Sequence, residues 1–131
     1  MSSAWMELKA EVIAQYQQQK QLADAALAGI DDTAFFTHLK EGGDNHTNSI
    51  AILVKHLSGN LISRWTDFLT SDGEKADRQR PREFVAAASD TRAQLLERWE
   101  EGWHCLFTSL EALTEADFAK TVYIRGEAHS V

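Results

Sequence analysis

The stretch NSIAILVKHLSGNLISRW, Asn48–Trp65, determines how this chain folds, because its apolar residues repeat at every third or fourth position. Such spacing places them along one side of a helix, and the wide apolar stripe that results must pack against another part of the chain. We expect this helix to start at Asn48 or Thr47, as its capping residue, and to continue to about Leu69. The expected core positions are Ile50, Val54, Leu57, Leu61, Trp65 and Phe68.

The same periodicity predicts two further long helices. One covers residues 3–28 and ends at Gly29, and the other covers residues 89–113 with Ser89 as its capping residue. Long amphipathic helices with one apolar stripe each are the components of an antiparallel bundle. The sequence therefore predicts an all-α fold in a single domain over residues 1–131.

The C-terminal segment has a different pattern. A short turn is expected at residues 114–117, KTVYIR alternates as a strand does, and Gly126 breaks it. His129-Ser130-Val131 resembles the opening of another helix. Because three helices leave the groove of a bundle open, we expect a C-terminal helix that these 131 residues do not include. A three-helix protein that closes by dimerising is the alternative.

Composition restricts the classes of function. Twenty acidic residues against thirteen Lys and Arg give a formal net charge of −7, which disfavours binding to nucleic acid. The most basic segment, KADRQRPR at residues 75–82, has no aromatic residues between its charges, so we interpret it as a solvated connector. A single cysteine, Cys105, excludes an internal disulfide and is typical of a reducing, cytoplasmic location. No apolar run is long enough to span a membrane.

Polar residues border the apolar stripe of the central helix. At about 100° per residue, His56, Asn60, Ser63 and Asp67 fall in a band roughly 60° wide. A border position can face the mouth of a bundle, where side chains of facing helices form metal and ligand sites. His56 is therefore the candidate metal ligand, because neutral imidazole is a common ligand of divalent metals. The alternative is a partly buried histidine satisfied by one hydrogen bond.

Other polar residues carry weaker indications. His38, His46, His104 and His129 are far apart in sequence, so no helix carries a pair of histidines. We expect His104 to be solvated and assign no role to the other three. Arg64 and Asp67 are expected to form a surface ion pair.

Three motifs show a resemblance to a known family. The segments NSIAILVKHLSGNLISRWTDFLTSDGEK, LLERWEEGWHCLF and TVYIRGEAHSV are similar to successive signatures of bacterial proteins in the DinB-like superfamily. The resemblance implies a four-helix bundle of up-down-down-up type, usually dimeric, with a divalent metal held by three histidines. His56 matches the first of these, and the other two would come from an HxxxH-like pair on the last helix, which is absent here.

Two hypotheses follow. The first is an enzyme that uses a divalent metal such as Zn, Ni or Fe and acts on a small molecule, either as a transferase, as in the thiol S-transferases of this superfamily, or as a hydrolase. His56 would bind the metal, and Asn60 and Asp67 would support it. The second is a non-catalytic helical module that serves dimerisation or binds a partner helix.

Overall fold

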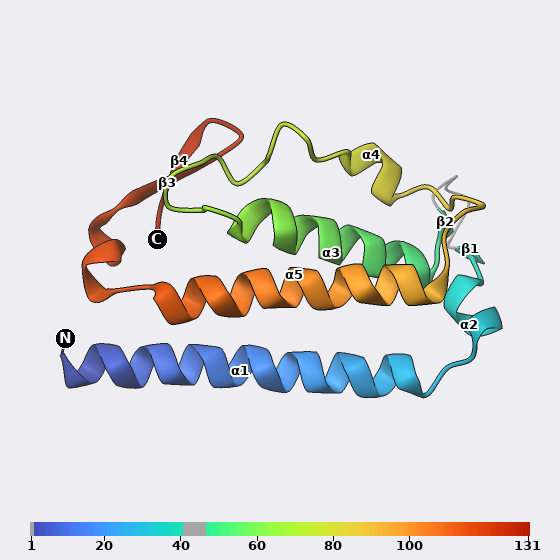
Figure 1. The fold of residues 1–131 in the computed structure, drawn as a ribbon, viewed down its shortest axis with the longest axis horizontal. Helices are drawn as coiled ribbons and strands as arrows, with labels where there is room; N and C mark the ends of the chain where they lie inside the picture. The colour runs from blue at the N-terminus through green and yellow to red at the C-terminus, as the bar shows by residue number, and fades with distance from the viewer. Residues whose placement is uncertain (1, 41–46) are drawn as a thin grey trace.

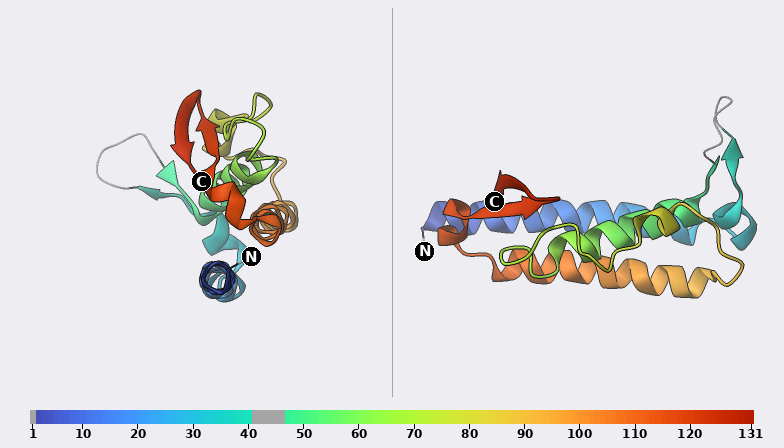
Figure 2. Two further views of the ribbon diagram at one scale, coloured as in Figure 1. Left: turned by 90° about the vertical axis from the view of Figure 1, so that its left-hand side faces the viewer. Right: turned by 90° about the horizontal axis from the view of Figure 1, so that it is seen from above.

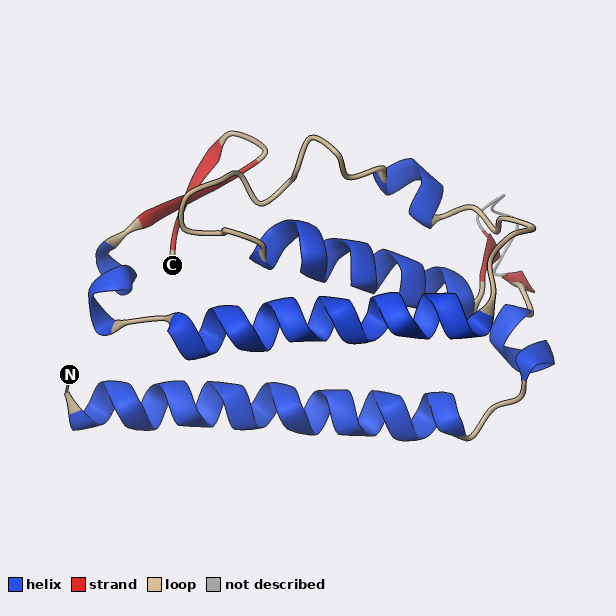
Figure 3. Ribbon diagram, in the orientation of Figure 1, coloured by secondary structure: helices blue, strands red, loops and turns tan. Residues whose placement is uncertain are grey.

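The computed structural model describes residues 2–40 and 47–131. In this part of the chain, three long helices lie side by side, and the shorter elements lie at both of their ends and along one face (Figure 1). The helices are α1 (Ser3–Ala28), α3 (Ile50–Trp65) and α5 (Arg92–Ala112). Figure 3 shows how strongly helix predominates over strand, which confirms the predicted all-α class.

The three long helices do not simply alternate in direction. α1 runs one way, and α3 and α5 both run the opposite way (Figure 1). α3 and α5 make the most extensive contact between any two of the described elements, while α1 packs chiefly on α5. Viewed end-on, they form the three corners of a bundle (Figure 2, left). The fourth long helix of the predicted bundle is not among the described elements and stays a prediction.

Helix α1 has the predicted bounds. The Ser2 hydroxyl accepts a hydrogen bond from the Trp5 amide at one end, and the Gly29 amide donates to the carbonyls of Ala25 and Ala26 at the other. Both contacts satisfy backbone groups that a helix end leaves without intrahelical partners. The short helix α2 (Asp32–Phe36) and the two-residue strands β1 (Leu39–Lys40) and β2 (Thr47–Asn48) then connect α1 to α3.

Helix α3 is shorter than predicted at both ends. Its capping residue is Ser49, whose hydroxyl accepts a hydrogen bond from the Ile52 amide. At its C-terminal end Thr66 is extended and Asp67 has a φ of 49°, so the chain turns away before Leu69. Leu57, expected in the core, is 45% exposed, because α3 turns its buried side toward α5 and the segment that follows α3.

Helix α5 also starts later than predicted. Thr91 caps it by accepting a hydrogen bond from the Gln94 amide, while Asp90 accepts one from the Ala87 amide in the preceding turn. The predicted cap at Ser89 is therefore wrong. The core has two parts, and α5 contributes residues to both. One part contains Phe35, Ala51, Val54, Leu95 and Trp99, and the other contains Ile13, Leu106 and Leu110.

The C-terminal segment forms a hairpin. A 3-10 turn, η1 (Glu115–Ala119), leads into strand β3 (Thr121–Ile124), which pairs antiparallel with β4 (Glu127–Ser130). The strand predicted in KTVYIR is confirmed, but the helix predicted to open at His129 is wrong, because His129 pairs with Val122. No helix in the described ranges is both long and apolar enough to cross a membrane.

Candidate functional site

His56 contacts a carboxylate from a distant part of the sequence. Its Nδ1 atom lies 3.1 Å from Oε1 of Glu83, a residue of the short helix α4 (Arg80–Glu83). The imidazole also packs against the ring of Phe84, with 4.8 Å between ring centroids. The His56 side chain is 27% exposed. It is therefore held on two sides and still open to solvent.

Glu83 is itself fixed by an arginine. Arg78 donates two hydrogen bonds to the carboxylate, from Nε to Oε2 at 2.9 Å and from a terminal nitrogen to Oε1 at 2.8 Å. Such paired bonds between a guanidinium and a carboxylate are short, directional and charge-assisted. The two side chains are only 7% and 11% exposed. We call His56, Glu83 and Arg78 the imidazole cluster.

This arrangement decides which nitrogen of the imidazole carries the proton. A carboxylate that is ionised and paired with Arg78 can only accept hydrogen bonds, so Nδ1 of His56 must be the donor. In the neutral ring, Nε2 then carries a lone pair. Carboxylates play this orienting role beside many histidines that bind metals or accept protons. The cluster therefore presents a basic nitrogen in a defined orientation.

The local sequence explains why Glu83 reaches α3. Pro81 lies in the first turn of α4, where a missing backbone N–H costs nothing, and the chain folds back there over α3. The solvated connector predicted at residues 75–82 is confirmed only in part: residues 76, 77, 79, 81 and 82 are exposed, but the side chain of Arg78 is buried against Glu83. A proline followed closely by an acidic residue is the signal for a helical start that could have indicated this turn.

The other residues of the predicted polar band, Asn60, Ser63 and Asp67, are not part of the imidazole cluster. The buried hydroxyl of Ser63 donates to the carbonyl of Gly73 and accepts from the amide of Lys75, so it anchors the segment after α3. Asp67 lies beyond the end of α3 and is exposed, and its carbonyl accepts hydrogen bonds in the following turn. Helical spacing predicted that Asp67 would share a band on the helix with His56, and this prediction is wrong because α3 ends before Asp67. Asn60 stays on α3 and is half-buried.

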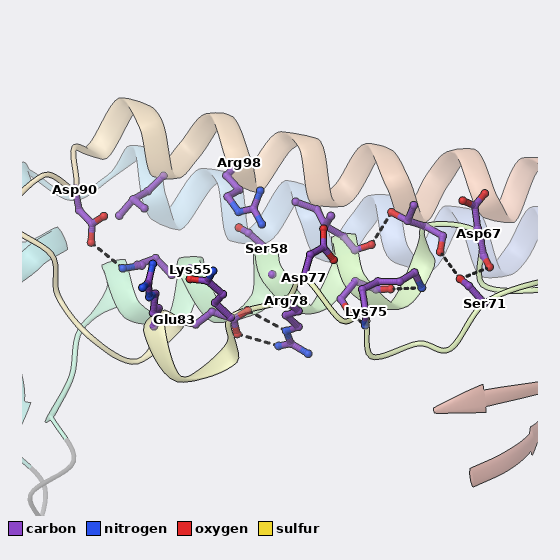
Figure 4. Close-up of a pocket in the computed structure, with 17 residues that line it drawn as sticks. Lys55, Ser58, Asp67, Ser71, Lys75, Asp77, Arg78, Glu83, Asp90 and Arg98 are labelled. Atoms are coloured by element: carbon purple, nitrogen blue, oxygen red, sulfur yellow. Dashed lines mark hydrogen bonds and ion pairs between the residues drawn. The ribbon is translucent and has the colours of Figure 1, made fainter. Parts of the chain in front are cut away.

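A polar cleft of about 670 Å³ lies next to the imidazole cluster (Figure 4). Glu83 and Arg78 belong to its wall, which α3, α5 and the segment between them form. Basic and acidic side chains alternate around it, and one pair, Lys55 and Asp90, is joined at 2.9 Å (Figure 4). Its volume is within the range of about 300–1,000 Å³ that is usual for small-molecule sites.

Lys75 is a partly buried basic group in the wall of this cleft. Its Nζ donates to the backbone carbonyls of Ser63 and Asp72. Burial lowers the pKa of Lys75 from its ordinary value, and the charges of three nearby aspartates oppose that shift. A lysine that gives up its charge more easily than usual can take part in proton transfer or bind a polar ligand.

Comparison with known proteins places the chain in a family. The family model described as "Protein of unknown function (DUF1572)" matches residues 2–131. The chain belongs to this family. No curated protein and no solved structure matches it. The DinB-like assignment is broader than this finding and stays a prediction.

The described residues of this DUF1572 protein do not supply a complete metal site. Within residues 2–40 and 47–131, no three His, Cys, Asp or Glu side chains are close enough together to hold a metal ion. His56 offers one nitrogen, and Glu83 is already paired with Arg78. A resident metal would need donors from outside this part of the chain.

The remaining histidines do not join His56. His104 is exposed on α5, as predicted, and His38 and His129 are exposed as well. His46 lies outside the described residues. Sequence analysis therefore found one member of the imidazole cluster and missed the other two.

Proposed function

We propose that this DUF1572 protein is an enzyme of the DinB-like type that acts on a small molecule, as a transferase or a hydrolase, with His56 as one ligand of a divalent metal. The observation that supports it is the contact between Nδ1 of His56 and the buried carboxylate of Glu83. That contact leaves Nε2 free and orients it, as a ligand imidazole requires. The proposal requires further metal donors from outside the described residues.

The direction of the long helices also supports the DinB-like assignment. One helix followed by two that run the opposite way is the order of the first three helices in an up-down-down-up bundle (Figure 1). This is an argument from fold, which does not select a reaction. The homodimer and the cytoplasmic location belong to the same proposal, and light scattering on the purified protein tests the first of them.

In this proposal each residue around His56 has its own role. Arg78 holds the Glu83 carboxylate in place with two hydrogen bonds, Glu83 accepts a hydrogen bond from Nδ1 of His56, and Phe84 limits rotation of the ring. The polar cleft beside Glu83 would receive the substrate. A bound divalent metal would supply Lewis-acid chemistry or lower the pKa of a bound thiol or water.

Metal titration tests the proposal. We expect the purified protein to bind Zn²⁺, Ni²⁺ or Fe²⁺ at one ion per chain in calorimetry, and the His56→Ala variant to lose this binding. The Glu83→Gln variant should bind about 10–100-fold more weakly, since residues that orient a ligand have effects of this size. The matched control is His104→Ala, which removes an exposed histidine from another helix and should bind as the unmodified protein does. Equal binding by His56→Ala and the unmodified protein would show that His56 is not a ligand.

A non-catalytic interaction module is the second candidate. Leu53 and Leu57 lie one turn apart on α3 and are 48% and 45% exposed, so together they form a contiguous apolar patch of the kind that a partner can cover. This candidate predicts a dimer that persists in His56→Ala and no stoichiometric metal. The titration above and light scattering on the same variant therefore separate the two candidates.

A further inference from the structure

The polar cleft between α3, α5 and the segment that joins them is formed without the C-terminal segment. The last of its described lining residues in sequence is Arg98, and α3 contributes Gly59 and Ile62 to its wall. At about 100° per residue, these α3 positions lie roughly opposite the exposed side of the helix, where Leu53 and Leu57 are. A further helix packed on that exposed side would leave the cleft accessible.

Part of the charge in the cleft is neutralised within its own wall. Glu83 accepts two hydrogen bonds from Arg78, and Asp90 pairs with Lys55 at 2.9 Å. Lys75 donates to two backbone carbonyls, one on α3 and one in the turn that follows it. These five side chains therefore have partners inside the protein.

Two arginines of the wall remain open to a ligand. Arg98 projects from α5 over Ser58 (Figure 4), and its ion pair with Glu101 of the same helix is long, at 3.9 Å, with both side chains more than half exposed. Arg82, next to Glu83 in α4, is exposed and forms no ion pair with any residue that the structure describes. This part of the cleft therefore carries excess positive charge, although the chain as a whole has a net charge of −7.

Two aspartates lie further along the cleft. Figure 4 shows Asp77 between Arg98 and Lys75, and Asp67 near the far end, where α3 has finished. Neither aspartate forms an ion pair within the part of the chain that the structure describes, so the predicted pair of Asp67 with Arg64 is wrong. The open charges of the cleft are thus positive at one end and negative at the other.

These two ends are separated by about the length of a tripeptide. Ser58, beneath Arg98, and Thr66, which precedes Asp67, are eight residues apart on α3 and its capping position. At about 1.5 Å per helical residue this distance is about 12 Å, and three extended residues span about 10 Å. At about 30 Å³ per water-sized atom, the cleft volume of about 670 Å³ has room for about twenty non-hydrogen atoms.

We propose that the polar cleft receives a small zwitterion of the amino-acid or short-peptide type, with its carboxylate on Arg98 and its ammonium group toward Asp77 and Asp67. Arginine suits the carboxylate because its planar guanidinium offers two parallel donors. Complementary charge at both ends favours a molecule with both groups over one that has a single charge. The inference rests on the proposed function, since it names the class of substrate for the cleft described there.

Calorimetric titration with triglycine and two of its derivatives tests the inference. Triglycine carries both charges, N-acetyltriglycine only the carboxylate, and triglycine amide only the ammonium group. We expect saturable binding of one triglycine per chain, and binding of each derivative that is weaker by about tenfold or more, because hydrogen bonds to one charged group are lost. Glycine, titrated in parallel, distinguishes the two sources: tighter binding of triglycine indicates a peptide, and tighter binding of glycine indicates a free amino acid.

Each variant should act only on the end of the ligand that it contacts. Arg98→Gln should weaken triglycine binding by about tenfold or more and leave triglycine amide, which has no carboxylate, at least as tightly bound. Asp67→Asn combined with Asp77→Asn should weaken triglycine binding to a similar degree and leave N-acetyltriglycine, which has no ammonium group, at least as tightly bound. Asparagine accepts the φ of 49° at position 67. A variant that failed to fold would lose both ligands, so it could not produce this pattern.

Arg125→Gln is the matched control for Arg98→Gln. It removes an arginine of nearly the same side-chain exposure, 53% against 54%, from the tip of the hairpin. Its affinity for triglycine should equal that of the unmodified protein.

Absence of saturable binding of both triglycine and glycine would overturn the inference, as would equal or tighter binding of either derivative. The proposed metal site fails or holds separately, because His56 lies outside the wall that the described residues form. Triglycine should bind equally well with a chelator present. Binding that the chelator abolishes would place the carboxylate on a metal instead of Arg98, which contradicts this inference and supports the metal proposal.

Discussion

Gly59 is the residue that lets the imidazole cluster form. It lies on α3 directly beneath Glu83, and a Cβ atom placed there would come within 1.9 Å of Oε2 of that glutamate. Only the absence of a side chain lets the carboxylate lie across the helix and reach both Arg78 and His56. The helix tolerates the glycine although glycine lowers helix stability by about 0.5–1 kcal/mol relative to alanine.

The Gly59→Ala variant should lose stability for this reason. We expect the free energy of unfolding to fall by about 0.5–2 kcal/mol, because overfilling a tightly packed site costs about 1–3 kcal/mol and the better helix propensity of alanine offsets about 0.5–1 kcal/mol of it. The end of the Glu83 side chain would move and lose its contacts with the cluster. Urea denaturation followed by circular dichroism measures the change.

Gly29→Ala is the matched control. Gly29 has a φ of −83°, and an added Cβ would meet no atom closer than 3.5 Å. Its replacement should leave stability unchanged or raise it by about 0.4–1 kcal/mol, since alanine restricts the unfolded chain. A Gly59→Ala variant as stable as the Gly29→Ala variant would mean that Glu83 does not lie over α3.

At this scale the sequence predicted only part of the site. His56 was identified from its place beside the apolar stripe, but Glu83 is 27 residues further along the chain. No helical spacing relates residues on different elements, so their contact depends on how the chain folds back. Asp67 was misplaced because the helix was expected to continue beyond Trp65.

The tip of the C-terminal hairpin is bound by the carboxylate of Asp72, in addition to the ion pair of Arg125 with Glu74 and the hydrogen bond from the Gly73 amide to the Tyr123 carbonyl. Asp72, in the turn after α3, accepts hydrogen bonds from the amides of Arg125 and Gly126 at the hairpin tip, at 2.8 and 2.7 Å. Both of these residues have positive φ values, 52° and 77°, as in the two-residue turns that join tightly twisted strands. The contact attaches the hairpin to the helical part of the chain.

Acid should weaken this attachment. Hydrogen bonds from three backbone amides lower the pKa of Asp72 from its ordinary value of 3.8. A lowered pKa means that the stabilisation is present above pH 3.8 and is lost as the pH falls through the lowered value. We expect the amides of Arg125 and Gly126 to be protected from hydrogen exchange at pH 5 and above, and Asp72→Asn to reduce that protection at pH 7. Equal protection in the two proteins would mean that the hairpin is held by other contacts.

The helices and strands with the most regular sequence pattern were predicted most accurately. α1 has the expected bounds because its periodicity is long and Gly29 follows it directly. β4 was missed because four residues with an exposed, polar pattern do not distinguish a strand from a helix opening. The pair Arg125-Gly126 is a hairpin signal, and we interpreted the glycine only as the end of a strand.

The whole molecule has a helical frame with two separate recesses. The polar cleft lies on the side of α3 that α4 covers, and an apolar cavity of about 380 Å³ lies beneath the hairpin. Sequence periodicity predicted the frame, because each long helix carries its own apolar stripe. It did not predict the recesses, which form between segments far apart in sequence.

The central claim is that α4 folds back onto α3, so that Nδ1 of His56 donates a hydrogen bond to Glu83 and Nε2 stays free. Nitrogen-15 NMR of the imidazole tests this most directly, since the two ring nitrogens differ strongly in chemical shift with protonation. We predict that neutral His56 carries its proton on Nδ1, and that Glu83→Gln reduces this preference while His104 is unaffected. A neutral His56 with its proton on Nε2 would contradict the account, because the free lone pair would then face Glu83.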